Sequence, residues 1–257
     1  MPTELFEWAC EQIEDKYKQL DHTYGWRLLT TPSATLSHKP DIAFITLNPG
    51  GDTIHPDHGR ESCENGSAYI YERWPRGKGK GPATHNRGEA PLQKQVQALF
   101  KEIALLIGEP DYRSMMDTSL MAYYIPFRSP SYSELLKPKE SREFAFNLWS
   151  CLTENISPRL ILTIDRITFE DFKKILGKKP GCKRADHPPL PTGWGKTTVD
   201  VTWYTIPGSR RVVVTRFPHL SRFRIFNRQK SKKHMGQILS LITEHLRQCP
   251  NKFEVMT

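Results

Sequence analysis

The sequence predicts a three-layer α/β/α sandwich around a central, mostly parallel sheet of four strands. Helical and strand patterns alternate along the chain, an order typical of parallel α/β proteins with helices on both faces of the sheet. The length of 257 residues suits one such domain. Because no linker or repeat divides the chain, we expect a single domain over residues 1–257.

Four short apolar runs, each followed by a turn signal, are the predicted strands. They cover residues 41–47, 119–125, 159–164 and 211–215. Apolar residues at helical spacing predict helices over residues 3–20, 92–107, 133–155, 169–176 and 235–247. We expect a long inserted loop at about 52–91 and a Pro- and Gly-rich loop at 178–196.

Positive charge is concentrated near the end of the chain. The net charge is +9, and residues 201–243 contain no acidic residue. Nine lysines and arginines lie in that stretch, which suits a polyanion such as nucleic acid. A solvated basic face is the alternative interpretation.

Composition argues against several classes of protein. No apolar run reaches the ~20 residues that a membrane span needs, and the N-terminal residues lack an apolar signal core. The five cysteines are scattered without a CxxC pair, so we expect free thiols rather than a metal or disulfide framework. These features favour a cytoplasmic protein, which we expect to be a monomer without membrane contact.

Three strand ends carry short motifs. Residues 45–50 (ITLNPG) form a strand ending in Asn-Pro-Gly, which resembles the first motif of the uracil-DNA glycosylase superfamily. Residues 123–130 (YYIPFRSP) resemble the middle of its thermostable branches, and residues 214–221 (VTRFPHLS) resemble a degenerate second motif. The resemblance spans roughly residues 41–245. It implies a uracil-DNA glycosylase-like fold and a DNA N-glycosylase that needs no cofactor and no metal.

The resemblance implies catalytic roles for Asn48, Asp52 and His219. Asn48 would orient the water that attacks the anomeric carbon, and Asp52 would activate that water or stabilise the sugar cation. His219 would donate a hydrogen bond to the departing base. From the residues alone, Asn48 and Asp52 can equally cap turns, and His219 can be a surface or packing residue.

The resemblance also implies a base pocket at the same strand ends. Its predicted residues are Leu47, Pro49, Gly50, Gly51, Tyr123 and Phe127. The two glycines would leave room for a large base, and Tyr123 replaces an Asn that often reads uracil in the superfamily. These departures favour a modified base such as glucosylated hydroxymethylcytosine of phage DNA, which an antiviral branch of the superfamily excises. Uracil is the alternative substrate.

The implied partner is double-stranded DNA, including phage DNA. Leu220, Phe223 or Ile225 would be the wedge that fills the gap left by a flipped nucleotide. The predicted DNA contacts are Arg128, Arg216, Leu220, Ser221, Arg222, Phe223 and Arg224. An amphipathic surface segment is the alternative interpretation of this region.

Two other classes of protein remain open. One is a catalytically silent DNA-binding module on the same fold. The other is a metal-dependent nuclease, because the spacing of Asp52, His55, Asp57 and His58 permits a metal site. No distant partner ligands are evident, so we expect no metal. The motifs hold no lysine for a Schiff base, so we expect simple hydrolysis without lyase chemistry.

Overall fold

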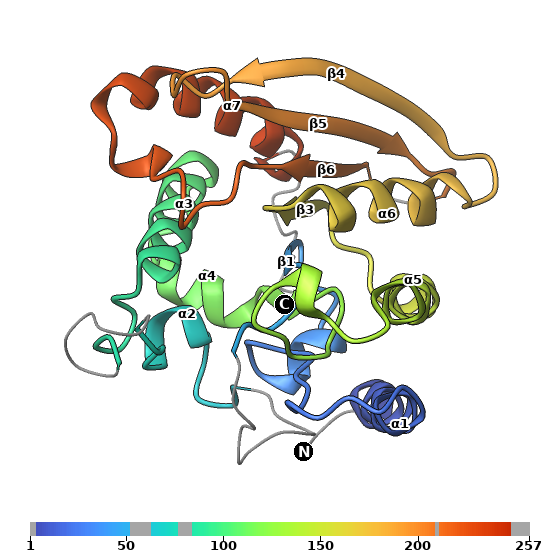
Figure 1. The fold of residues 1–257 in the computed structure, drawn as a ribbon. Coiled ribbons are helices and arrows are strands. Elements are labelled where there is room, and N and C mark those ends of the chain that lie inside the picture. Colours follow the sequence, from blue (N-terminus) through green and yellow to red (C-terminus); the bar gives the residue numbers. More distant parts are fainter. Residues whose placement is uncertain (1–3, 52–62, 77–83, 209–210, 248–257) are drawn as a thin grey trace, which may run out of the picture.

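The computed structural model describes residues 4–51, 63–76, 84–208 and 211–247 (Figure 1). It has an α/β fold with a mixed sheet of six strands in the order β2-β1-β3-β6-β5-β4. The predicted four strands are confirmed as its parallel part: β1 (Ile42–Thr46), β2 (Leu120–Tyr123), β3 (Leu160–Thr163) and β6 (Val212–Arg216). Their carboxyl ends therefore meet along one edge of the sheet, where ligands bind in parallel α/β folds.

An antiparallel hairpin extends the sheet beyond β6, so the predicted four-stranded sheet is too small. Its strands are β4 (Lys183–Pro191) and β5 (Thr198–Thr205). The prediction of a loop over 178–196 is wrong in its central part, where Lys183–Pro191 forms β4. This strand lies at the sheet edge and is largely exposed, so it lacks apolar alternation. An edge position also tolerates Pro188 and Pro189, where the register shifts.

Helices cover both faces of the sheet, as the sequence predicts. The side chains of Ala43 and Ile45 join a core with α1 (Glu4–Gln19), α5 (Pro138–Asn155) and α6 (Arg166–Gly177). Ile42 and Phe44 point to the other face, towards α3 (Pro91–Ile107), α4 (Tyr112–Thr118) and α7 (Gln229–Arg247). This alternation makes β1 a strand buried on both sides. Figure 1 shows the two groups of helices on opposite sides of the sheet.

Three helices begin at other residues than the sequence predicts. The helix predicted at 133–155 begins at Pro138, after the short 3-10 helix η2 (Tyr132–Glu134). The helix predicted at 169–176 begins at Arg166, because the Asp165 side chain caps its first turn. The last helix begins at Gln229. Among the described residues, no helix combines the length and apolarity that a bilayer crossing requires.

Part of the predicted inserted loop is folded against α3. Residues 68–71 form a short helix, α2 (Ala68–Tyr71). The buried Gln93 donates through Nε2 to the carbonyls of Ala68 and Glu72, and Gln97 donates to those of Tyr69 and Gly88. Two glutamines of α3 thus satisfy the backbone of this segment, which the sequence alone presents as unstructured.

Candidate functional site

A pocket of about 1090 Å³ opens at the carboxyl ends of the parallel strands. Asn48 follows β1, Tyr123 ends β2, Asp165 follows β3 and His219 follows β6, and all four line this pocket. Small-molecule pockets usually measure about 300–1,000 Å³, so this one is large for a single pyrimidine. The sheet topology alone explains why residues so distant in sequence converge here.

The turn after β1 holds Asn48 in a defined orientation. Its Nδ2 donates to Ser129 Oγ at 2.8 Å and to the Pro49 carbonyl at 3.2 Å, while Ser129 Oγ donates to the Ser131 carbonyl. The amide nitrogen is therefore used by the neighbouring loop. The carbonyl oxygen of Asn48 accepts no hydrogen bond from the described residues, so it remains available to a water or a ligand.

The glycines of this turn leave space at the pocket. A Cβ placed on Gly50 would have no atom within 4 Å, and Gly50 is exposed in the pocket lining. Gly51 has a φ of +127°, a backbone conformation that favours glycine. Arg128 lies beside it and donates from Nη1 to the Gly50 carbonyl at 2.7 Å. Arg128 is thus a pocket residue that braces the turn.

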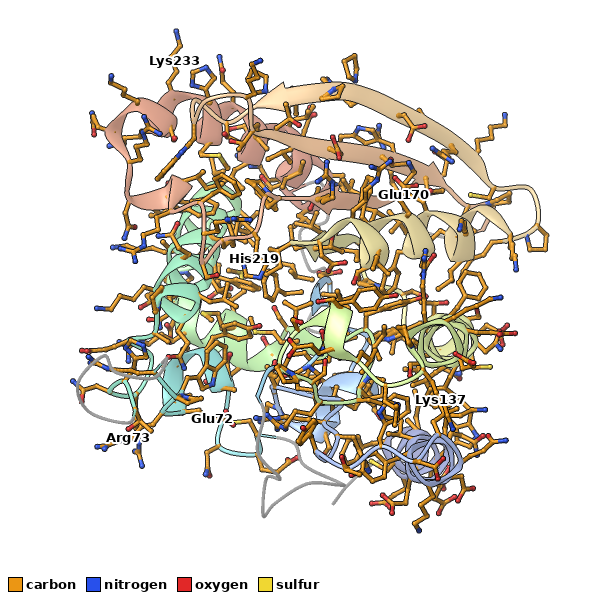
Figure 2. The ribbon with its side chains drawn as sticks, viewed as in Figure 1. Glu72, Arg73, Lys137, Glu170, His219 and Lys233 are labelled. Carbon is orange, nitrogen blue, oxygen red and sulfur yellow. The ribbon has the colours of Figure 1, made fainter. Side chains whose placement is uncertain are left out.

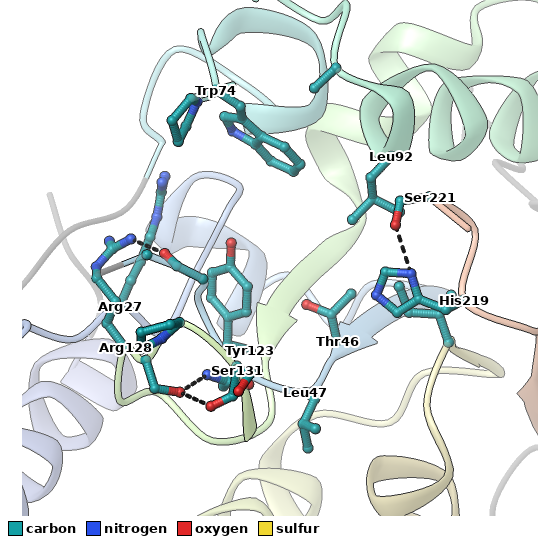
Figure 3. A pocket seen from close by; sticks show the side chains of 18 of the residues that line it. Arg27, Thr46, Leu47, Trp74, Leu92, Tyr123, Arg128, Ser131, His219 and Ser221 are labelled. Atoms are coloured by element: carbon teal, nitrogen blue, oxygen red, sulfur yellow. Dashed lines mark hydrogen bonds between the residues drawn. The ribbon is translucent and has the colours of Figure 1, made fainter. Parts of the chain in front are cut away.

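The wall opposite the strand ends comes from α2, the residues that follow it and the first turn of α3. Tyr69, Glu72, Trp74 and Leu92 line the pocket there, and the rings of Tyr69 and Trp74 meet edge to face at 5.1 Å. In Figure 3 the ring of Tyr123 points from its strand towards Trp74, with His219 on the other side of the pocket. The sequence analysis missed this wall, because its residues carry no motif.

A buried ion pair anchors that wall. The largely buried Arg27 donates to both carboxylate oxygens of Glu72, at 3.0 and 2.6 Å, and Trp74 Nε1 donates to Glu72 at 3.2 Å. Burial opposes ionisation, but the hydrogen bonds and charge of Arg27 hold the pKa of Glu72 below its ordinary value. The pair positions Trp74 at the pocket.

Glu72→Gln is expected to lower the free energy of unfolding by about 2–3 kcal/mol, because it leaves the buried Arg27 without its counter-charge. Urea denaturation at neutral pH measures this loss. Because the folded state lowers the pKa of Glu72, the wild-type advantage disappears as acid protonates the carboxylate. The exposed Glu89, which accepts from Asn86, gives the control Glu89→Gln, and an equal loss in both variants would contradict the anchoring role.

His219 reaches the pocket from the segment after β6. Its Nδ1 lies 2.9 Å from Ser221 Oγ, and Ser221 also lines the pocket (Figure 3). Partial burial, and then the charge of Arg222, lower the pKa of His219. The ring is therefore neutral at physiological pH. When Ser221 donates to Nδ1, Nε2 carries the ring proton and is a hydrogen-bond donor.

Asp165 is a pocket residue that the sequence analysis missed. Its Oδ1 accepts from the amide of Thr168 at 2.8 Å, and its buried Oδ2 has no hydrogen-bond partner among the described residues. Burial raises the pKa of Asp165 to about 6, against the lowering effect of Thr168. Perturbed carboxyl groups of this kind are frequent in functional sites. The helix predicted at 169–176 begins four residues after Asp165, so the sequence analysis did not place Asp165 at the end of a strand and the start of a helix.

Several predicted site residues lie elsewhere. Phe127 is fully buried and stacks on His22 at 4.2 Å, so it belongs to the core and not to the pocket. Pro49 is buried beneath the turn and does not line the pocket. Leu47 and Gly51 do line it. Asp52 lies outside the described residues, as do His55, Asp57 and His58 of the predicted acidic and histidine cluster.

The predicted DNA-contacting segment divides into buried and exposed residues. Leu220 and Ile225 are fully buried and cannot act as a wedge, whereas Phe223 is half-buried and packs edge-on against Trp194. Arg216 is paired with Asp200 across the β5–β6 ladder, which makes it a weak candidate for phosphate contact. The exposed residues of the segment include Arg222 and Arg224.

Cations lie on both sides of the pocket. Figure 2 shows Arg73 beside the wall segment and Lys233 on α7, with His219 between them and Lys137 on the far side near α1.

Within the described ranges, no group of three His, Cys, Asp or Glu side chains is arranged to hold a metal ion.

No family model and no curated protein sequence matches this chain. The class of the protein is therefore inferred from the fold and from the site itself.

Proposed function

We propose that this protein is a monofunctional DNA glycosylase of the uracil-DNA glycosylase superfamily. It would hold a flipped base in the pocket and hydrolyse the N-glycosidic bond. The observation that carries this proposal is the convergence of Asn48, Tyr123 and His219 in one pocket, at the ends of parallel strands. The described pocket lining includes no lysine, which favours hydrolysis over Schiff-base chemistry.

The orientation of the polar groups suits this chemistry. Cleavage of the glycosidic bond develops positive charge on the sugar and negative charge on the base. The carbonyl oxygen of Asn48, which accepts no hydrogen bond from the described part of the chain, can accept from the attacking water and orient it. The neutral His219 can donate from Nε2 to an oxygen of the departing base, where its hydrogen bond strengthens as charge develops.

The shape of the pocket favours a modified base over uracil. Gly50 leaves open space, Tyr123 supplies no amide to read uracil, and Trp74 extends the pocket beyond the strand ends. Glucosylated hydroxymethylcytosine of phage DNA is the leading substrate candidate, which would make the protein an antiviral enzyme. Stacking against aromatic side chains is a general means of holding a flipped base.

Oligonucleotides that carry uracil, hypoxanthine or glucosylated hydroxymethylcytosine test this proposal. The expected result is abasic-site formation in the glucosylated DNA. Robust release of uracil alone would identify a divergent repair enzyme and contradict the modified-base substrate. DNA binding without release of any base would identify a silent binding module.

Arg222→Gln with Arg224→Gln is expected to weaken DNA binding and to reduce the salt dependence of the affinity. Each phosphate contact contributes about −0.9 to the slope of log affinity against log salt, so the pair should lower its magnitude by about 2. Fluorescence anisotropy over a salt series measures the slope. Lys139→Gln, an exposed site on α5, is the matched control. An unchanged slope in the double variant would place the DNA on another surface.

A further inference from the structure

Asp165 occupies the centre of the site. In the sheet order, β3 lies between β1 and β6, so Asp165 follows the strand between those that present Asn48 and His219. It lines the same pocket as both of them. The catalytic chemistry proposed above uses Asn48 and His219 and leaves this carboxyl group without a role.

The Asp165 carboxyl group is only half satisfied. Capping of α6 uses Oδ1, whereas the buried Oδ2 has no hydrogen-bond partner among the described residues, and neither has the nearby Thr168 hydroxyl. No lysine or arginine among the described residues forms an ion pair with Asp165. A buried carboxylate in this state gains from a donor supplied by a ligand.

The surrounding charges do not neutralise Asp165. Burial is the main cause of the raised pKa of Asp165, and the nearby Asp171 on α6 adds to it; Asp171 is itself held by Arg142 of α5 and by the Tyr124 hydroxyl. Lys174 lies 3.6 Å from Asp171 on the same helix. Across the pocket, His219 is neutral. Burial raises the pKa of Asp165 only to about 6, so at neutral pH the group is mainly a carboxylate, which accepts hydrogen bonds but does not donate them.

Bases differ in what they offer such an acceptor. Cytosine presents an exocyclic amino donor where uracil presents a carbonyl acceptor, and Asp and Glu side chains pair with the amino group. We propose that Asp165 is a specificity-determining residue whose carboxylate accepts a hydrogen bond from the exocyclic amino group of a cytosine-type base. This inference rests on the proposed glycosylase function. It makes the pocket select against the keto edge of uracil.

Asp165→Asn tests this inference, because asparagine caps a helix as well as aspartate does and so retains α6. Asp111→Asn is the matched control. The Asp111 side chain caps α4 by accepting a hydrogen bond of 2.9 Å from the Arg113 amide, and Asp111 does not line the pocket. The probes are three pairs of double-stranded oligonucleotides with an abasic analogue opposite the target base, so that base pairing does not differ between the members of a pair. In each pair, one DNA carries a cytosine-type base (the amino member) and the other carries the matching uracil-type base (the keto member). The base is unsubstituted in the first pair, 5-hydroxymethylated in the second and glucosylated on the 5-hydroxymethyl group in the third.

The wild type should release the amino member of at least one pair faster than the keto member. Asp165→Asn should reduce that ratio by about tenfold or more, because its amide can also donate to a carbonyl oxygen. An unchanged ratio in Asp165→Asn, or wild-type preference for the keto member, would overturn the inference while leaving the glycosylase activity intact. Absence of release from all six DNAs by the wild type would instead overturn the proposed function, and the inference with it.

The wild-type pH profile tests the same inference without any variant. The carboxyl group ionises as the pH rises through about 6, so the amino-to-keto ratio should rise between about pH 5 and pH 8. Below that range the protonated group donates to a carbonyl, which favours the keto base. A ratio that stays flat over this range would contradict the role of Asp165 even if Asp165→Asn did not fold.

Discussion

Asn48→Ala is expected to slow single-turnover base release by about 10²–10³-fold, the usual effect of removing one positioned polar group from an active site. The substitution removes the only group at the β1 turn that we assign to orienting the attacking water. DNA affinity should stay within about twofold, because Asn48 lies inside the pocket and not on the exposed basic segment. Rapid-quench measurement with enzyme in excess separates the chemical step from binding.

Asn155→Ala is the matched control for this prediction. Asn155 is exposed at the end of α5, where its amide donates to the Cys151 carbonyl. Release by this control should match the wild type. If Asn48→Ala retained more than about a fifth of the wild-type rate, the turn after β1 would not be the catalytic element, and Asn48 would be only a turn residue.

Gly50→Tyr is expected to abolish release of a base with a large substituent while retaining release of a small base. The backbone of Gly50 is not left-handed, and a Cβ there meets no atom within 4 Å, so the tyrosine introduces little strain. Its ring would occupy the pocket space that we assign to the substituent. The expected loss for the large base is at least about 10³-fold, because overlap with a fixed side chain excludes the bound geometry.

Two further variants make the Gly50 series decisive. Gly50→Ala should change release little, since a methyl group fills almost none of the pocket. Gly177→Tyr places the same ring on another exposed glycine with open space, at the end of α6. If Gly50→Tyr slowed the release of large and small bases equally, the substitution would have disturbed the turn itself. Retained release of the large base would show that the substituent does not lie over Gly50.

The sequence was sufficient for the parallel strands and for the edge at which the site lies. Their apolar runs are buried on both faces, which is a strong local signal, and a turn follows each run. The hairpin was missed because β4 is exposed and contains prolines. Because the hairpin was not predicted, the ion pair between Asp200 and Arg216 was not predicted either. The two residues meet only through the pairing of β5 with β6.

The errors within the site have a common cause. A motif shows that a loop follows a strand, but it does not show which side chains of the loop turn inward. Phe127, Leu220 and Ile225 are apolar and complete the two cores, where burial is favourable. Asp165 was missed because the helix predicted at 169–176 begins too late, so its position at the junction of β3 and α6 was not recognised.

The most direct test of the account is mass spectrometry of the products released from modified phage DNA in water enriched in heavy oxygen. We expect an intact free modified base without the label and an abasic sugar that carries one oxygen from the solvent, both formed about 10²–10³-fold more slowly by Asn48→Ala. Release of nucleotides, or no free base from any DNA, would contradict the assignment of this site to hydrolysis of an N-glycosidic bond.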